Sequence, residues 1–314
     1  MSRLRPEIHP LLTEDIVKAL QGRKVWTVID FIKLDTQEIN KIARLNFREV
    51  RAVKNYLLKK FSATPLNGFD FYKNVLKNTA IIPTEIKGVD QLLNGGLFTG
   101  NIYELCGPPT SGKSYFVLNL IKNVILNMNQ NVYIFDNKND FSARKIKKML
   151  KNCDEDRQIR SLSKIIVNRS YTKYDLINSL YEIKNDLENN MKLRLIIIDS
   201  LPSILLNSND YVTNNSYLNH IVNIMRYIAN EHHIAFLVTN LITKFIDGGF
   251  NKSQQENSEI ISCGKYWSNV PNTRLKIEKT ENSRGFKISV LSSDTLNKKM
   301  DNCVDVMLTD EGFL

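Results

Sequence analysis

The chain has 314 residues and a formal net charge of +10, with 42% hydrophobic and 24% charged residues, as in soluble globular proteins large enough to bury a core. No run of about 18 apolar residues occurs, and MSRLRPEIHP lacks the apolar centre of a signal peptide, so we expect no membrane span and no secretion leader. The four cysteines form no C-x-x-C pair, which argues against a zinc site and a disulfide framework.

Residues 1–60 are predicted to form a basic bundle of short helices. Apolar residues recur at helical spacing in LTEDIVKAL, TVIDFIKLDTQEINKIARL and FREVRAVKNYLLKKF. The segment carries 13 Lys and Arg against 7 Asp and Glu, whereas the remainder carries 30 against 26. A concentration of charge of this kind favours a nucleic-acid backbone as ligand, and a solvated lysine-rich surface is the alternative. Trp26 and Trp267 are expected to be core anchors.

Residues 61–84 are predicted to be a linker, punctuated by Pro65, Gly68 and Pro83, and residues 85–314 an α/β core. Strands are expected at 101–106, 132–136, 164–168, 193–199 and 234–240, with helices between them. This alternation predicts a mostly parallel central sheet that is covered by helices on both faces. Further strands, antiparallel at the sheet edge, are expected at 273–279, 286–293 and 304–313.

The stretch CGPPTSGKSYF (106–116) fits the phosphate-binding pattern G-x-x-x-x-G-K-[ST], after a predicted strand and at the start of a predicted helix. In this motif backbone N–H groups surround the phosphates, the lysine neutralises the β- and γ-phosphates, and the hydroxyl binds Mg²⁺. We therefore expect ATP and Mg²⁺ as cofactors. The residues expected to contact the nucleotide are Gly107, Pro108, Pro109, Thr110, Ser111, Gly112, Lys113, Ser114, Tyr115 and, later in the chain, Asn240.

Two strand ends complete the predicted site. Asp199 ends the apolar strand LRLIIID, where an acidic group would hold magnesium through water, so Ser114 and Asp199 are the expected metal ligands. Asn240 ends the next strand, where it could sense the γ-phosphate or serve only as a turn residue.

Together these motifs resemble the RecA-like recombinases of eukaryotes. The resemblance rests on GVDQLLNGGLFTGNIYELCGPPTSGKS, LIIIDS, VTN and a late Thr-Arg pair, which follow a basic helical module. It is most specific for the D-type paralogue of the Rad-fifty-one recombinase. That likeness rests on LLTEDIVKAL, KVWTVIDFI, FSATPLNGFDFYKNVLKNTAII and GKYWSNVPNTRLKI, and it runs from about residue 10 to the end.

The resemblance implies a RecA-like P-loop ATPase core behind a small helical DNA-binding domain, and a nuclear role in homologous-recombination DNA repair. It implies single-stranded or branched DNA as a ligand. It also implies a hetero-oligomer in which the X-type recombinase paralogue contacts the N-terminal part and the C-type paralogue contacts the ATPase core.

Three departures from the family pattern favour an accessory subunit. Where active recombinases have Asp-Thr-Glu, whose glutamate activates the attacking water, this chain has Asp136, Asn137 and Lys138, and a lysine is not a base at neutral pH. The glutamine that commonly follows the sensor asparagine is Leu241, and FSA at 61–63 lacks the F-x-x-A spacing. We therefore predict weak DNA-stimulated ATP hydrolysis. An autonomous DNA-stimulated ATPase and strand-exchange recombinase is the alternative.

DNA contacts are expected in the N-terminal bundle and in two loops, at about 201–215 and 242–266. In the bundle several basic residues are expected to share a helix face, where they could serve a DNA backbone or an acidic partner equally well. They are Arg44, Arg48, Arg51 and Lys54, with Lys59 and Lys60 after them. The second loop is long and polar, and its lysines are Lys244, Lys252 and Lys265. An ordinary surface loop is the alternative there.

Overall fold

The computed structural model describes residues 3–62, 65, 67–189, 191–205, 211–245, 258–282, 284–294, 296, 302–309 and 312–313, with the backbone alone at 211–213, 244–245 and 258. The chain divides into two compact units, Met1–Val75 and Leu76–Leu314, and each is described by itself. In the described parts of the chain no helix is both long and apolar enough to cross a bilayer.

The first unit is the predicted bundle of short helices. Its elements are the 3₁₀ helix η1 (Pro6–Ile8) and helices α1 (Glu14–Gln21), α2 (Val28–Lys33), α3 (Thr36–Ala43) and α4 (Phe47–Phe61). Reciprocal capping boxes fix the starts of α2, through Thr27 and Asp30, and of α4, through Asn46 and Glu49. The inward faces of the helices form an apolar core of their own around Phe31.

Trp26 does not anchor this core, contrary to expectation, because 45% of it is exposed. The backbone is extended where Arg3 bridges Thr27, so successive side chains point to opposite sides. Val25 takes the inward direction and is buried, and the neighbouring tryptophan therefore faces solvent.

The segment predicted as a linker contains regular structure. Helix α5 (Gly68–Asn78) has no buried residue, and its aromatic residues Phe69, Phe71 and Tyr72 are all more than half exposed. It is followed by β1 (Ile81–Ile82), which pairs antiparallel with β2 (Leu97–Phe98) in the second unit.

The second unit is built on a mixed sheet, and the predicted fold class is confirmed. Among the described residues the sheet has ten strands in the order β12-β11-β10-β9-β3-β7-β6-β4-β5, with β8 beside the end of β7. The pairs from β9 to β5 are parallel, and β10 to β12 are antiparallel at one edge. The strands are β3 (Ile102–Gly107), β4 (Asn131–Asp136), β5 (Ile165–Asn168), β6 (Leu193–Asp199), β7 (Ala235–Phe245), β8 (Ser258–Ile261), β9 (Thr273–Lys279), β10 (Gly285–Ser293), β11 (Cys303–Thr309) and β12 (Gly312–Phe313).

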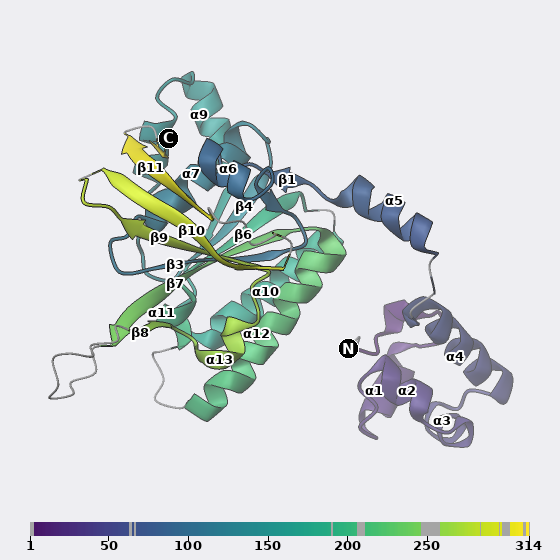
Figure 1. Cartoon of the computed structure of the whole chain (residues 1–314). Coiled ribbons are helices and arrows are strands. Elements are labelled where there is room, and N and C mark those ends of the chain that lie inside the picture. Colours follow the sequence, from purple (N-terminus) through teal and green to yellow (C-terminus); the bar gives the residue numbers. More distant parts are fainter. Residues whose placement is uncertain are drawn as a thin grey trace, which may run out of the picture. The chain divides into compact units, whose positions relative to one another are not determined.

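Helices cover both faces of this sheet, as Figure 1 shows. The side chains of β6 alternate between two cores: Leu195 and Ile197 face one of them, and Ile196 and Ile198 face the other. The first core is closed by α6 (Lys87–Leu92), α7 (Lys113–Leu126), α8 (Ala143–Met149) and α9 (Glu155–Leu162). The second is closed by α10 (Lys173–Glu188), α11 (Leu201–Leu205), α12 (Tyr211–His232) and α13 (Gly264–Ser268). A strand that is apolar on both faces must lie inside the sheet, which explains the central place of β6.

Candidate nucleotide-binding site

The predicted site residues meet at one edge because parallel strands present their carboxyl ends together. The register pairs Asp136 of β4 with Asp199 of β6, and Cys106 of β3 with Asn240 of β7. The loop after β3 therefore opens beside the ends of β4, β6 and β7, the place where α/β sheets bind ligands.

The phosphate loop depends on its two glycines. Gly112 has a φ of +97°, and a Cβ there would lie 2.8 Å from the Phe286 ring and 3.3 Å from Ile277. A Cβ at Gly107 would meet the carbonyl oxygen of Ile277. Of the other predicted contacts, Ser111 and Lys113 are buried, Pro108 and Ser114 are half-buried, and Pro109, Thr110 and Tyr115 are exposed. The tight packing of β9 and β10 against the loop thus requires glycine at both positions.

Lys113, at the start of α7, folds back over the loop. Its Nζ donates to the carbonyl oxygens of Gly107 at 2.8 Å and Pro108 at 2.7 Å, and to Ser111 Oγ at 3.3 Å. Burial, and then the nearby charge of Lys138, lower the pKa of Lys113 to about 8. The ammonium is therefore held where phosphates would lie, among weak neutral acceptors that an anion would displace.

Asp199 is already engaged by two donors on one oxygen. Thr239 Oγ1 donates to Asp199 Oδ1 at 2.6 Å, and Lys138 Nζ lies 2.8 Å from the same atom. The side chains of Lys138 and Asp199 are only 25% and 7% exposed. The sequence did not point to Thr239, although its place directly before Asn240, at the expected end of that strand, is a usable signal.

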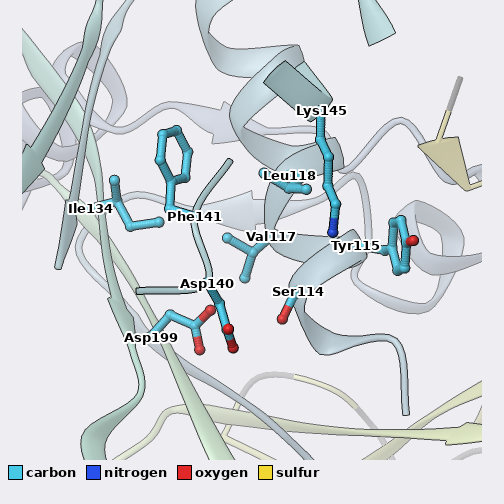
Figure 2. Close-up of a pocket in the computed structure, with 9 residues that line it drawn as sticks. All are labelled: Ser114, Tyr115, Val117, Leu118, Ile134, Asp140, Phe141, Lys145 and Asp199. Atoms are coloured by element: carbon cyan, nitrogen blue, oxygen red, sulfur yellow. The ribbon is translucent and has the colours of Figure 1, made fainter. Parts of the chain in front are cut away.

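The oxygen atoms of Ser114, Asp140 and Asp199 gather at the mouth of a small pocket (Figure 2). Hydroxyl and carboxylate oxygens are the ligands that Mg²⁺ accepts, so Ser114 and Asp199 fit the metal by donor type. In the described residues no group of three or more His, Cys, Asp or Glu side chains could hold a metal unaided. Phosphate and water oxygens would thus complete the shell, and Lys138 would compete for Asp199.

A larger cavity of about 570 Å³ adjoins this pocket and shares Tyr115, Leu118 and Lys145 with it. Lys148, Lys151 and Arg284 add three more positive charges to its lining, and Lys145 lies over the Tyr115 ring at 5.3 Å. A hollow that combines an aromatic ring with several cations suits a nucleoside and its phosphates. The sequence reasoning missed these cations because they come from two segments far apart in the chain, α8 with the residues after it and the turn before β10.

Asn240 belongs to a buried polar network around Glu104, which has no exposed surface. Glu104 Oε1 accepts from Asn240 Nδ2 and from Trp267 Nε1, both at 2.6 Å, and its Oε2 is bound by Arg274 Nε. Asn240 Nδ2 also donates to the carbonyl oxygen of Ser262 at 3.0 Å. The amide thus joins β3 to the segment after β8, and its role toward a γ-phosphate stays a prediction. Trp267 is the expected core anchor.

The basic residues predicted to bind DNA differ in their surroundings. Arg44, Arg48 and Arg51 are exposed. Lys54 is half-buried, and its Nζ donates to the carbonyl oxygen of Leu34 at 2.5 Å, which satisfies the end of α2. Three of the four are therefore available to a ligand, and Lys54 already has a structural contact.

The expected loop at 242–266 is regular at both ends. Strand β7 continues to Phe245 and pairs antiparallel with β8, because apolar residues such as Ile242 and Ile261 face each other there. Lys265 is exposed on α13. Two of the predicted lysines lie outside the described residues, Lys244 with its side chain and Lys252 entirely. In the other expected loop, positions 206–210 also lie outside them, and the rest of that loop is helical in α11 and α12.

Comparison with known proteins matches nearly the whole chain. A family model described as "Rad51" matches residues 76–307, and one described as "RAD51D, N-terminal domain" matches residues 1–60. DNA repair protein RAD51 homolog 4 of Bos taurus is 30% identical over 292 residues, 90% of this chain and 87% of that protein. The probable DNA repair protein RAD51 homolog 4 of Dictyostelium discoideum is 25% identical over 310 residues, 85% of each chain. The DNA repair and recombination protein RadB of Pyrococcus furiosus is 25% identical over 183 residues, 58% of this chain and 76% of that protein.

Proposed function

The chain belongs to the Rad51 family, and we propose that it is a nuclear ATP-binding accessory subunit in homologous-recombination DNA repair. It binds single-stranded or branched DNA, assists assembly of a recombinase filament, and hydrolyses ATP weakly when DNA is present. The names of its relatives support a role in DNA repair. We further propose C-type and X-type recombinase paralogues as its partners.

The observation that carries this proposal is the pairing of Lys138 with Asp199 at 2.8 Å. Hydrolysis needs a group that takes a proton from the attacking water, and an ammonium bound to a carboxylate cannot take one. The same ammonium adds positive charge beside Lys113, which favours a bound polyphosphate. The site is therefore better suited to holding a nucleotide than to cleaving it.

The residues of the chain divide the work of binding. The N–H groups of the phosphate loop and of the start of α7 would bind the phosphates, and Lys113 would exchange its carbonyl partners for phosphate oxygens. Bound Mg²⁺ would neutralise β- and γ-phosphate charge. Ser114 would ligate it directly and Asp199 through water. Tyr115 and Lys145 line the adjoining cavity, where a nucleoside would lie.

One observation favours the alternative, an autonomous DNA-stimulated ATPase. Asp140 places a carboxylate beside Asp199 and across from Ser114 (Figure 2). Its backbone N–H donates to Asp136 Oδ1 at 2.9 Å, which fixes the turn that carries it. A carboxylate at that place could accept a proton from water in the way that Lys138 cannot.

ATP turnover by the purified chain, with and without single-stranded DNA, separates the two functions. The accessory role predicts ATP binding that is lost in Lys113→Ala, together with slow turnover that DNA raises only slightly. Brisk DNA-stimulated turnover that is lost in both Lys113→Ala and Asp140→Asn would establish the alternative. Binding assays with the C-type and X-type paralogues test the partners.

A further inference from the structure

The magnesium ligand of this site already carries a cation of the protein's own. Asp199 Oδ1 binds the Lys138 ammonium at 2.8 Å and the Thr239 hydroxyl at 2.6 Å. Both members of the ion pair are largely shielded from solvent, so bulk water and salt screen it less than a surface pair. A hydrated Mg²⁺ that used this oxygen of Asp199 would have to displace the ammonium.

The turn that carries Lys138 is fastened to the sheet on both sides of it. The backbone N–H of Asn137 donates to the carbonyl oxygen of Asp199 at 3.0 Å, and Asn137 Nδ2 reaches the carbonyl oxygen of Ser200 at 3.4 Å. The N–H of Asp140 is held by Asp136 Oδ1 at 2.9 Å. Lys138 is thus presented to Asp199 by a fixed backbone, and only its side-chain torsions could carry the ammonium away.

The position of Lys138 also places it in the field of the phosphate site. Its charge is close enough to Lys113 to contribute to the lowered pKa of that residue. An ammonium has three N–H donors, and the bond to Asp199 uses one of them. The others can serve phosphate oxygens, which is the charge neutralisation that a divalent cation otherwise provides.

We propose that Lys138 takes the place of magnesium on Asp199, so that this chain binds a nucleoside triphosphate nearly as well without Mg²⁺ as with it. The inference rests on the proposed function, because it requires that the phosphate loop binds a nucleotide. It concerns affinity alone and holds at any rate of hydrolysis.

The test is the ratio of two affinities, measured by titration calorimetry of the full-length chain with a non-hydrolysable ATP analogue. One titration contains saturating Mg²⁺ and the other an excess of chelator. For the unaltered chain we expect Mg²⁺ to tighten binding by less than about threefold. Lys138→Gln frees Asp199 for the metal. In this variant the ratio of the affinity with Mg²⁺ to the affinity without it should rise to about tenfold or more, because a tenfold change corresponds to about one charge-assisted hydrogen bond.

Lys145→Gln is the matched control, because Lys145 lines the pocket of Asp199 but lies over the Tyr115 ring and makes no ion pair with Asp199. It should weaken binding with and without Mg²⁺ alike and leave the ratio unchanged. A ratio of tenfold or more in the unaltered chain would overturn the inference, even if Lys138→Gln failed to fold. Absence of binding under both conditions would instead refute the proposed function, and the inference with it.

Discussion

Replacing Glu104 by Gln should destabilise the second unit far more than its small change of shape implies. The variant keeps the volume of the side chain but removes the charge that compensates Arg274, whose side chain is only 9% exposed. It also sets an amide N–H₂ among donors from Asn240, Trp267 and Arg274. Breaking one side of a buried ion pair costs about 3 to 5 kcal/mol.

Equilibrium unfolding in urea, followed by the fluorescence of Trp267, measures this loss. Trp26→Phe serves as the background, since the chain has two tryptophans and Trp26 lies outside the core of its unit, with 45% of it exposed. With a denaturant slope of about 3 kcal/mol per molar, the midpoint should fall by about 1 to 2 M. The double variant Glu104→Gln with Arg274→Met should recover part of the loss, because no buried charge is then left unpaired.

The control for this prediction is Glu278→Gln, on the same strand as Arg274. Glu278 lies 3.0 Å from Lys276 and is 38% exposed, so its loss should cost less than about 1 kcal/mol. If Glu104→Gln unfolds at the same urea concentration as Glu278→Gln, the buried network does not stabilise the unit and the reasoning is refuted.

Three further predictions concern the nucleotide site and the basic bundle. The pKa of Lys113 is lowered to about 8, and a bound phosphate needs the charged ammonium of this residue. The affinity for ATP should therefore be independent of pH below about 8 and fall by up to about tenfold per pH unit above it. A calorimetric affinity that stays constant up to about pH 9 would contradict this. Gly112→Ala should abolish nucleotide binding and lower the melting temperature much more than Gly264→Ala does. Both glycines have positive φ, but only Gly112 has close neighbours that a Cβ would meet. Equal melting temperatures of the two variants would refute this clash. Arg51→Gln should weaken DNA binding and reduce the salt slope by about one, whereas an unchanged slope in fluorescence anisotropy would remove that residue from the interface.

Local pattern was enough to predict most of the architecture. The alternation of apolar strands such as LRLIIID with helices predicted the mostly parallel sheet, and the glycines and lysine after residue 106 predicted a loop between a strand and a helix, where β3 and α7 place it. These features depend on neighbours in the chain, which a single sequence displays.

Contacts between distant segments were not predictable in the same way. The pairing of Lys138 with Asp199 requires that β4 and β6 lie side by side in a particular register, which composition does not reveal. The outward Trp26 depends on one extended backbone bridge, and the ordered ends of the second loop depend on pairing between β7 and β8. The sequence did identify Lys138 as an unusual residue, but not the atom that it binds.

The central place of β3 has a consequence for how the protein is made. Its sheet neighbours, β7 and β9, and the residues packed on Gly112, Ile277 and Phe286, all follow it by well over a hundred positions. During synthesis the loop leaves the ribosome early, but its surroundings cannot form until β9 and β10 have been made. Pairing between strands so far apart in the chain is slow. A product terminated before β10 would thus lack the packing around Gly112, and with it the nucleotide binding proposed above.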